Sequence, residues 1–129
     1  MDHNQAKKLC DNWLPAWTGG KGSVERLLTY YAEGAFYLDP ANPEGITGHA
    51  ELRRYFEKLL LRNPDWHWEA EEIIPTERGF TLKWKASIPS GADMNTIKGL
   101  DIVEVVDGLI TRNEVYFDLL LLVMPTRGR

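Results

Sequence analysis

The sequence contains a single cysteine, Cys10, among its 129 residues, so no disulfide can form within the chain. It also lacks a long apolar run: the longest aliphatic stretch, Leu119 to Met124, is far shorter than the roughly 20 residues of a membrane-spanning helix. The first ten residues, MDHNQAKKLC, have neither the apolar core nor the small-residue cleavage site of a secretory signal peptide. We therefore expect a cytoplasmic protein without a transmembrane segment.

Positive charge is neither abundant nor clustered in this chain. Its 15 Lys and Arg residues are outnumbered by 19 Asp and Glu residues, which gives a net charge of −4. The basic residues are scattered, and this argues against binding to nucleic acid or to an anionic membrane. The three histidines lack the spacing of metal ligands, and residues 19–22 (GGKG) lack the spacing of a phosphate-binding loop. We therefore expect no metal and no cofactor.

Apolar side chains, by contrast, are plentiful. They make up 43% of the residues and include five tryptophans, a composition typical of a folded globular protein. A chain of 129 residues fits one core, so we expect a single domain over residues 1–129. The aromatic side chains are numerous enough to line a cavity as well as to fill that core.

Helical periodicity dominates the first half of the sequence. Apolar residues recur there every three or four positions, and Pro15, Ser23, Gly34 and Pro64 limit the segments. The expected helices cover residues 6–17, 24–33 and 49–62, and a short strand covers residues 35–38. A turn rich in Pro and Gly follows that strand.

The second half changes to a period of two, which is typical of β-strands. The segment FTLKWKASI, residues 80–88, alternates without error between apolar and polar residues. Strands are expected at 66–74, 80–88, 96–106 and 109–121, and Asp107 and Gly108 join the last two as a hairpin. Helices followed by antiparallel strands predict a cone-shaped α+β fold, in which three helices pack on a strongly curved, mainly antiparallel sheet that encloses a pocket.

Asp101 interrupts the more apolar face of its predicted strand. By the period of two it shares that face with Ile97, Gly99, Val103 and Val105. A carboxyl group in such a place loses its hydration, so its pKa rises and the protonated form is favoured unless a cation is near. The alternative is that the strand register is shifted, or that Asp101 lies at the rim of the sheet.

A second acidic residue, Asp39, ends the short strand within FYLDPANPEGITG, residues 36–48. Pro40 disfavours a helical conformation at Asp39 and so keeps that residue extended. Asp before Pro is also common turn chemistry. Both interpretations stay open: Asp39 shapes the turn, or it points a carboxylate into a pocket.

The motifs YYAEGAFYLDP, GITGHAELRRYFEKL and GLDIVEVVDGLITRNEVYFD resemble the nuclear transport factor 2 superfamily, particularly its SnoaL-like and ketosteroid-isomerase-like branches. The resemblance extends from about Trp13 to Asp118 and implies a cone-shaped domain with a pocket. It implies no single activity, because this fold hosts isomerases, cyclases, epoxide hydrolases, dehydratases and non-catalytic adaptors. It also implies a homodimer formed through the outer face of the sheet.

The closest chemical resemblance is to ketosteroid isomerase. Asp39 stands where that family has its general base, and Asp101 where it has a protonated acid that donates to an oxyanion. The family's second oxyanion donor is a tyrosine, and Trp13 falls at the matching position, where its indole N–H can donate one hydrogen bond. This departure argues against steroid isomerisation itself. The epoxide-hydrolase branch fits less well, since Val115 stands where that branch has an Asp.

These observations together predict an aromatic pocket for a small, mostly apolar, carbonyl-bearing molecule. If the protein is an enzyme, Asp39 takes a proton from the carbon next to the carbonyl, while protonated Asp101 stabilises the enolate. The alternative is a non-catalytic ligand-binding or adaptor protein, in which both acids are structural. The side chains expected to line the pocket are Trp13, Trp17, Tyr37, Tyr55, Phe56, Trp68, Trp84, Val103, Val115 and Phe117.

Overall fold

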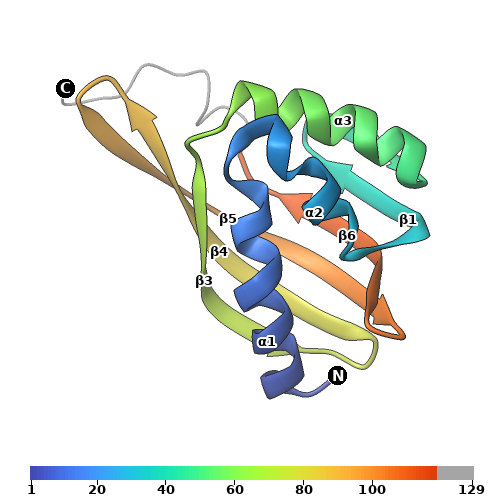
Figure 1. The fold of residues 1–129 in the computed structure, drawn as a ribbon. Coiled ribbons are helices and arrows are strands. Elements are labelled where there is room, and N and C mark those ends of the chain that lie inside the picture. Colours follow the sequence, from blue (N-terminus) through green and yellow to red (C-terminus); the bar gives the residue numbers. More distant parts are fainter. Residues whose placement is uncertain (119–129) are drawn as a thin grey trace.

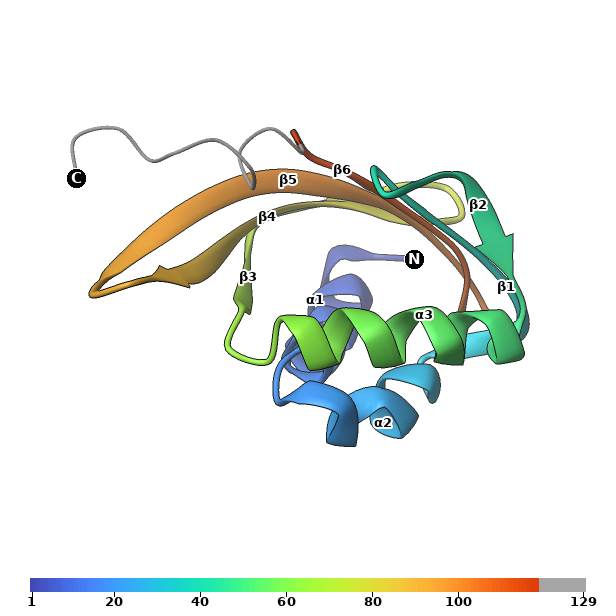
Figure 2. The ribbon, with the colours of Figure 1, turned by 90° about the horizontal axis from the view of Figure 1, so that it is seen from above.

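Three helices pack against the concave face of one curved sheet in the computed structural model, which describes residues 1–118 (Figures 1 and 2). The helices are α1 (His3–Trp13), α2 (Val24–Leu28) and α3 (His49–Arg62), with 3₁₀ turns at η1 (Leu14–Trp17) and η2 (Gly20–Ser23). The strands are β1 (Tyr31–Asp39), β2 (Asn42–Thr47), β3 (His67–Pro75), β4 (Gly79–Ser90), β5 (Asp93–Val106) and β6 (Leu109–Tyr116). None of these helices is long and apolar enough to cross a membrane.

The six strands form one mixed, mainly antiparallel sheet in the order β2-β1-β6-β5-β4-β3. Only β1 and β6 run parallel, and every other neighbouring pair is antiparallel. The predicted hairpin between β5 and β6 is confirmed: Asp107 and Gly108 have φ of 52° and 81°, the left-handed conformations of a type I′ turn. The predicted α+β fold is confirmed with it.

The second helix is shorter, and the first strand longer, than the sequence predicts. α2 ends at Leu28, and β1 begins at Tyr31, inside the segment expected to be helical. Tyr31 pairs with Ile110 of β6, and the Ile110 N–H donates to the Tyr30 carbonyl over 2.8 Å. Pairing with a strand distant in the sequence therefore overrides the local helical pattern.

β2 is a strand where the sequence predicts only a turn. It lies at the edge of the sheet, a position that tolerates Pro43 because one side of the strand needs no ladder partner. β5 begins at Asp93, three residues before its predicted start at Thr96. β6 ends at Tyr116, and residues 119–121 of the predicted last strand lie outside the described residues.

The core lies between the helices and the concave face of the sheet. The predicted faces of β4 and β5 are confirmed, since Leu82, Trp84 and Val103 are buried whereas Lys83 is exposed. Burial of each large apolar side chain contributes about 1.5–3 kcal/mol to stability. The same register brings Asp101 to the interior.

Candidate functional site

Asp101 lies on the concave face of the sheet, near the middle of its width. Leu82 of β4 and Val115 of β6 flank it in register. Its side chain is buried, with 5% of the residue exposed. The alternatives of a shifted register or a rim position are therefore excluded, and the carboxyl group sits between two apolar neighbours.

Two N–H groups point at the Asp101 carboxyl. The Trp84 indole Nε1–H donates to Oδ1 over 2.7 Å, and the Asn113 amide Nδ2–H donates to Oδ2 over 2.9 Å. The Asn113 Oδ1 in turn accepts a 2.8 Å hydrogen bond from the Tyr31 hydroxyl. Trp84 and Asn113 thus donate to the carboxyl group, and Tyr31 donates to the Asn113 oxygen behind it.

Gly99 allows the Trp84 indole to reach Asp101. A Cβ atom at Gly99 would lie 2.4 Å from the Trp84 ring and 2.8 Å from the Tyr116 carbonyl oxygen. The ring therefore lies across β5 where a side chain is missing. The sequence analysis placed Gly99 on the same strand face as Asp101. It did not predict that the missing side chain makes room for the Trp84 ring.

Burial raises the pKa of Asp101 from its ordinary value of 3.8 to about 7. The hydrogen bonds from Asn113 and Trp84 lower the pKa and offset part of this shift, while the negative charge of Asp39 raises it further. Within residues 1–118, no lysine, arginine or histidine forms an ion pair with Asp101. Asp101 is therefore balanced between its two protonation states near neutral pH.

Asp39 ends β1 and is equally buried, with 5% exposed. Its Oδ1 accepts hydrogen bonds from the backbone N–H groups of Ala41 (2.9 Å) and Asn42 (3.0 Å) and from the Asn42 side chain. Its Oδ2 accepts from the hydroxyls of Tyr37 (2.9 Å) and Tyr55 (2.5 Å). One oxygen thus shapes the turn, and the other points toward the aromatic interior.

The two tyrosines remain proton donors to Asp39. Burial raises the pKa of the Tyr37 hydroxyl, and the charge of Asp39 raises it further. Burial and the hydrogen bond to Asp39 likewise raise the pKa of Tyr55. Tyr55 is only half-buried, so its side chain can turn away more easily than that of Tyr37.

Trp13 carries the one buried side-chain N–H in residues 1–118 that lacks a hydrogen-bond acceptor. The residue is fully buried, and its ring packs edge-on against Tyr31 at a centroid distance of 6.5 Å. The N–H faces the Tyr31 hydroxyl outside the geometry of a full hydrogen bond and still lowers the pKa of that hydroxyl, although burial and the Asp101 charge raise that pKa by more. An unsatisfied buried donor costs about 1–3 kcal/mol, so an oxygen from a ligand at this position would be stabilising.

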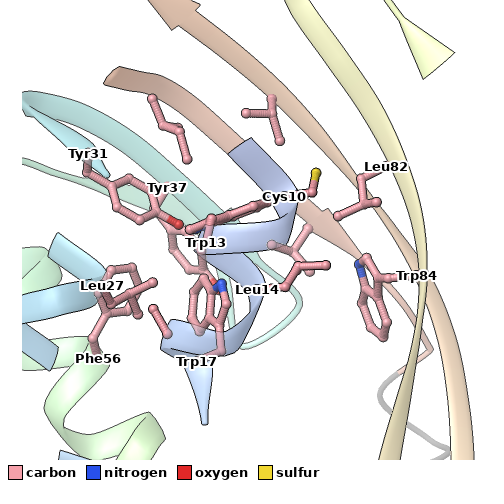
Figure 3. Close-up of a cluster of buried hydrophobic side chains, with 14 of the residues drawn as sticks. Cys10, Trp13, Leu14, Trp17, Leu27, Tyr31, Tyr37, Phe56, Leu82 and Trp84 are labelled. Carbon is pink, nitrogen blue, oxygen red and sulfur yellow. The ribbon is translucent and has the colours of Figure 1, made fainter. Parts of the chain in front are cut away.

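The side chains predicted to line a pocket mostly pack on one another. Seven are buried (Trp13, Trp17, Tyr37, Phe56, Trp84, Val103 and Val115), and three are half-buried (Tyr55, Trp68 and Phe117). Figure 3 shows Trp13 and Trp17 pointing toward Tyr31, Tyr37 and Phe56. Ring centroids in this cluster lie 5.0–6.5 Å apart. The half-buried rings of Tyr55 and Trp68 contact this cluster and mark its accessible edge, while Phe117 packs on Trp84.

A groove of about 700 Å³ lies elsewhere, between α1 and β3. Its lining is mostly charged, and it contacts neither Asp39 nor Asp101. Its Lys7 pairs with Asp11 over 2.8 Å, and its Glu69 pairs with Lys85 over 3.2 Å. Residues 1–118 contain no group of three His, Cys, Asp or Glu side chains arranged to hold a metal ion.

Sequence reasoning missed the roles of Asn113 and Tyr31 and did not place Cys10 near Asp101. Asn113 lies two residues before Val115 and therefore shares the inward face of β6 with it. The period of two along the strand could have identified Asn113. Tyr31 was assigned to a helix, and its partnership with Asn113 depends on the parallel pairing of β1 with β6. Cys10 is a buried thiol on α1, and burial together with the nearby Asp101 charge raises its pKa to about 12.

Comparison with known proteins adds a family and a fold. A family model described as a SnoaL-like domain matches residues 11–113. No curated protein matches this chain. A structure from Jannaschia sp. CCS1, described as a SnoaL-like polyketide cyclase, superposes with a TM-score of 0.76 at 13% identity, covering 98% of this chain and 94% of that chain.

Two further structures share the fold. A hypothetical protein with a ketosteroid isomerase-like fold from Catenulispora acidiphila DSM 44928, in complex with trimethylamine, gives a TM-score of 0.73 at 18% identity, covering 87% of this chain and 86% of that one. TerC, co-crystallised with polyporic acid, gives 0.74 at 13% identity, covering 92% and 95%. At such low identities these likenesses show a common fold alone.

Proposed function

This chain belongs to the SnoaL-like family, and from that premise we propose that it transfers a proton next to a carbonyl group of a small, mostly apolar molecule. Reactions of this class include isomerisations and ring closures. They need a group that removes a proton from carbon and donors that stabilise the negative oxygen formed. Asp39, Asp101 and Trp13 supply these groups in the proposal.

The carrying observation is that, among the described residues, one buried N–H lacks a hydrogen-bond acceptor, and that a proton on Asp101 would lack one as well. The Trp13 N–H has none among the described residues. A proton on Asp101 would face the same situation, because both of its side-chain partners, Trp84 and Asn113, offer N–H groups. A carbonyl oxygen of a ligand would accept from both and become an enolate oxygen.

Asp39 is the proposed base. The C–H bond next to the carbonyl breaks, its proton moves to Oδ2 of Asp39, and the electron pair forms a C=C bond as charge develops on the oxygen. Oδ2 already accepts from Tyr37 and Tyr55, so a substrate must displace one of them. The half-buried Tyr55, at the accessible edge of the aromatic cluster, is the one that can move.

A panel of apolar ketones in D₂O tests the proposal, with exchange of the proton next to the carbonyl followed by ¹H NMR. We expect the protein to accelerate exchange over buffer, Asp39→Asn to slow it by about 10²–10⁴-fold, and Trp13→Phe to slow it by about tenfold. The exposed Asp107 provides the control variant Asp107→Asn, which should match the unaltered protein.

The second candidate function is ligand binding without turnover. It is favoured by the hydrogen bonds of the two acids, because Asp39 and Asp101 are both buried and both fully bonded within the fold without any reaction. Polyporic acid, which TerC binds, is a suitable carbonyl-bearing probe, and quenching of tryptophan fluorescence would report its binding. If the protein binds such a probe but accelerates proton exchange in none of the ketones, ligand binding without turnover replaces the enzymatic proposal.

We also propose a homodimer through the outer face of the sheet. Leu100 and Tyr116 pair across β5 and β6 on that face and are 36% and 44% exposed. A Leu100→Lys substitution should turn the dimer into a monomer in sedimentation velocity, because it buries a charge in the interface. Leu61→Lys, at a 65% exposed site on α3, is the matched control. An unaltered protein that sedimented as a monomer would refute the proposal.

A further inference from the structure

We infer that Asn113 is a positioning residue for Asp101, and that the Tyr31 hydroxyl locks the Asn113 amide so that it cannot accept the Asp101 proton. The inference rests on the proposed function, because it explains how that proton stays available to a substrate. Tyr31 comes from β1, Asn113 from β6 and Asp101 from β5. Three strands therefore contribute one side chain each.

The orientation of the amide is the central feature. Its Nδ2–H donates to Asp101 Oδ2 over 2.9 Å, and its Oδ1 accepts from Tyr31 over 2.8 Å. If the amide turned by 180°, Oδ1 would face Asp101 and could accept its proton. The protein would then hold that proton in an internal hydrogen bond, where a substrate carbonyl would have to compete for it.

Tyr31 opposes this rotation. Its hydroxyl donates to Asn113 and to no other described side chain. A turned amide would present N–H to the hydroxyl and leave the tyrosine proton without that acceptor inside the core, where Tyr31 is 2% exposed. A buried donor without an acceptor is unfavourable, so the tyrosine favours the orientation that keeps the Asn113 oxygen away from Asp101.

The groups that face Asp101 come from four elements. They are Cys10 on α1, Tyr31 and Asp39 on β1, Trp84 on β4 and Asn113 on β6. Of these, Asp39 is the group whose charge raises the pKa of Asp101. Cys10 stays a neutral thiol because its pKa is raised to about 12, and the pKa of Tyr31 is raised as well. Changes to Asn113 or Tyr31 therefore alter hydrogen bonding around Asp101 without altering the charge there.

Tyr31→Phe tests the lock, with Tyr37→Phe as its matched control. Both tyrosines are 2% exposed, but the Tyr37 hydroxyl donates to Asp39 instead of Asn113. Without the Tyr31 hydroxyl the amide is free to turn and accept from protonated Asp101, which stabilises the acid form. We expect ¹³C NMR titration of the Asp101 carboxyl to show a midpoint raised by about one unit, a tenfold change in its proton equilibrium, in Tyr31→Phe. Tyr37→Phe should change it by much less.

The side-chain amide of Asn113 gives an independent readout. In the unaltered protein the ¹H chemical shifts of this amide should change with pH at the midpoint of Asp101. In Asp101→Asn this pH-dependent change should disappear. Should Tyr31→Phe fail to fold, Asn113→Leu removes the donor in a similar volume and should also raise the Asp101 midpoint. An unchanged midpoint in the variant that folds, or equal shifts in Tyr31→Phe and Tyr37→Phe, would overturn the inference.

These titrations need no substrate, so the two proposals can fail separately. A raised midpoint in Tyr31→Phe, together with no ketone exchange by the unaltered protein, would keep the hydrogen-bond lock and remove the enzymatic role. Proton exchange in a ketone by the unaltered protein, together with an unchanged Asp101 midpoint in Tyr31→Phe, would support the enzymatic role and refute the hydrogen-bond lock.

Discussion

Replacing Asp101 with asparagine should abolish most of the pH dependence of stability between about pH 4 and pH 7, the window between the ordinary and the raised pKa. In the folded protein the pKa of Asp101 is about 7, against an ordinary value of 3.8. Between these values the folded state binds a proton that the unfolded state has released. The free energy of unfolding therefore falls as the pH rises through this window and levels off above it.

The expected magnitude follows from the size of the shift. A displacement of about three pKa units corresponds to about 4 kcal/mol of stability, present below pH 4 and lost above pH 7. Asparagine resembles the protonated acid in shape and cannot ionise. The variant should thus be more stable than the unaltered protein at pH 8 by several kcal/mol, and about equal to it at pH 4.

Urea unfolding at a series of pH values measures this difference directly. Asp107→Asn is the matched control, because Asp107 is exposed in the β5–β6 turn and its φ of 52° is one that asparagine also adopts. That control should keep the pH profile of the unaltered protein. Parallel profiles for the unaltered protein and Asp101→Asn would show that Asp101 does not hold its proton in the folded state.

Removing the Asp39 side chain should destabilise the fold at pH 7 by about 3–5 kcal/mol. Its carboxylate accepts five hydrogen bonds, two of them from backbone N–H groups in the β1–β2 turn. Asp39→Ala leaves these donors without their acceptor, and the Tyr37 hydroxyl is buried where water does not replace it. The β1–β2 turn should therefore loosen together with the packing around Tyr37.

Asp39→Asn separates hydrogen bonding from charge at this site. The amide oxygen can still accept from the Ala41 and Asn42 N–H groups, while its NH₂ can donate to the tyrosine hydroxyls. We expect it to cost about 1–2 kcal/mol, clearly less than Asp39→Ala, when urea midpoints are compared. A loss below about 1 kcal/mol in both variants would contradict the anchoring role assigned to this carboxylate.

The sequence was most informative where one local pattern decided the structure. Alternation along residues 80–88 and 97–105 placed Trp84 and Asp101 on the inner face, and Asp107-Gly108 fixed the hairpin. It was least informative where distant segments meet. Tyr31 joins β1 because β6 pairs with it, and β2 forms because β1 offers an edge, and neither contact is visible in local periodicity.

The chemistry of the site shows the same division. The raised pKa of Asp101 follows from a carboxyl group on an apolar strand face, which the sequence displays. The direction of the Asn113 amide, the unsatisfied Trp13 N–H and the five donors to Asp39 depend on side chains brought together by tertiary structure. The family match and the shared fold identify the family and the architecture, and they name neither a reaction nor a substrate.

The central claim is that Asp101 exchanges its proton near neutral pH, and that its side-chain partners among the described residues offer that proton no acceptor. The most direct test is a ¹³C NMR titration of the side-chain carboxyl groups, with the Asp101 resonance assigned by its loss in Asp101→Asn. We predict a midpoint of about 7 for Asp101. A midpoint near the ordinary value of about 4 would mean that the carboxyl is hydrated or paired, and would contradict the proposed role of Asp101 as the acid.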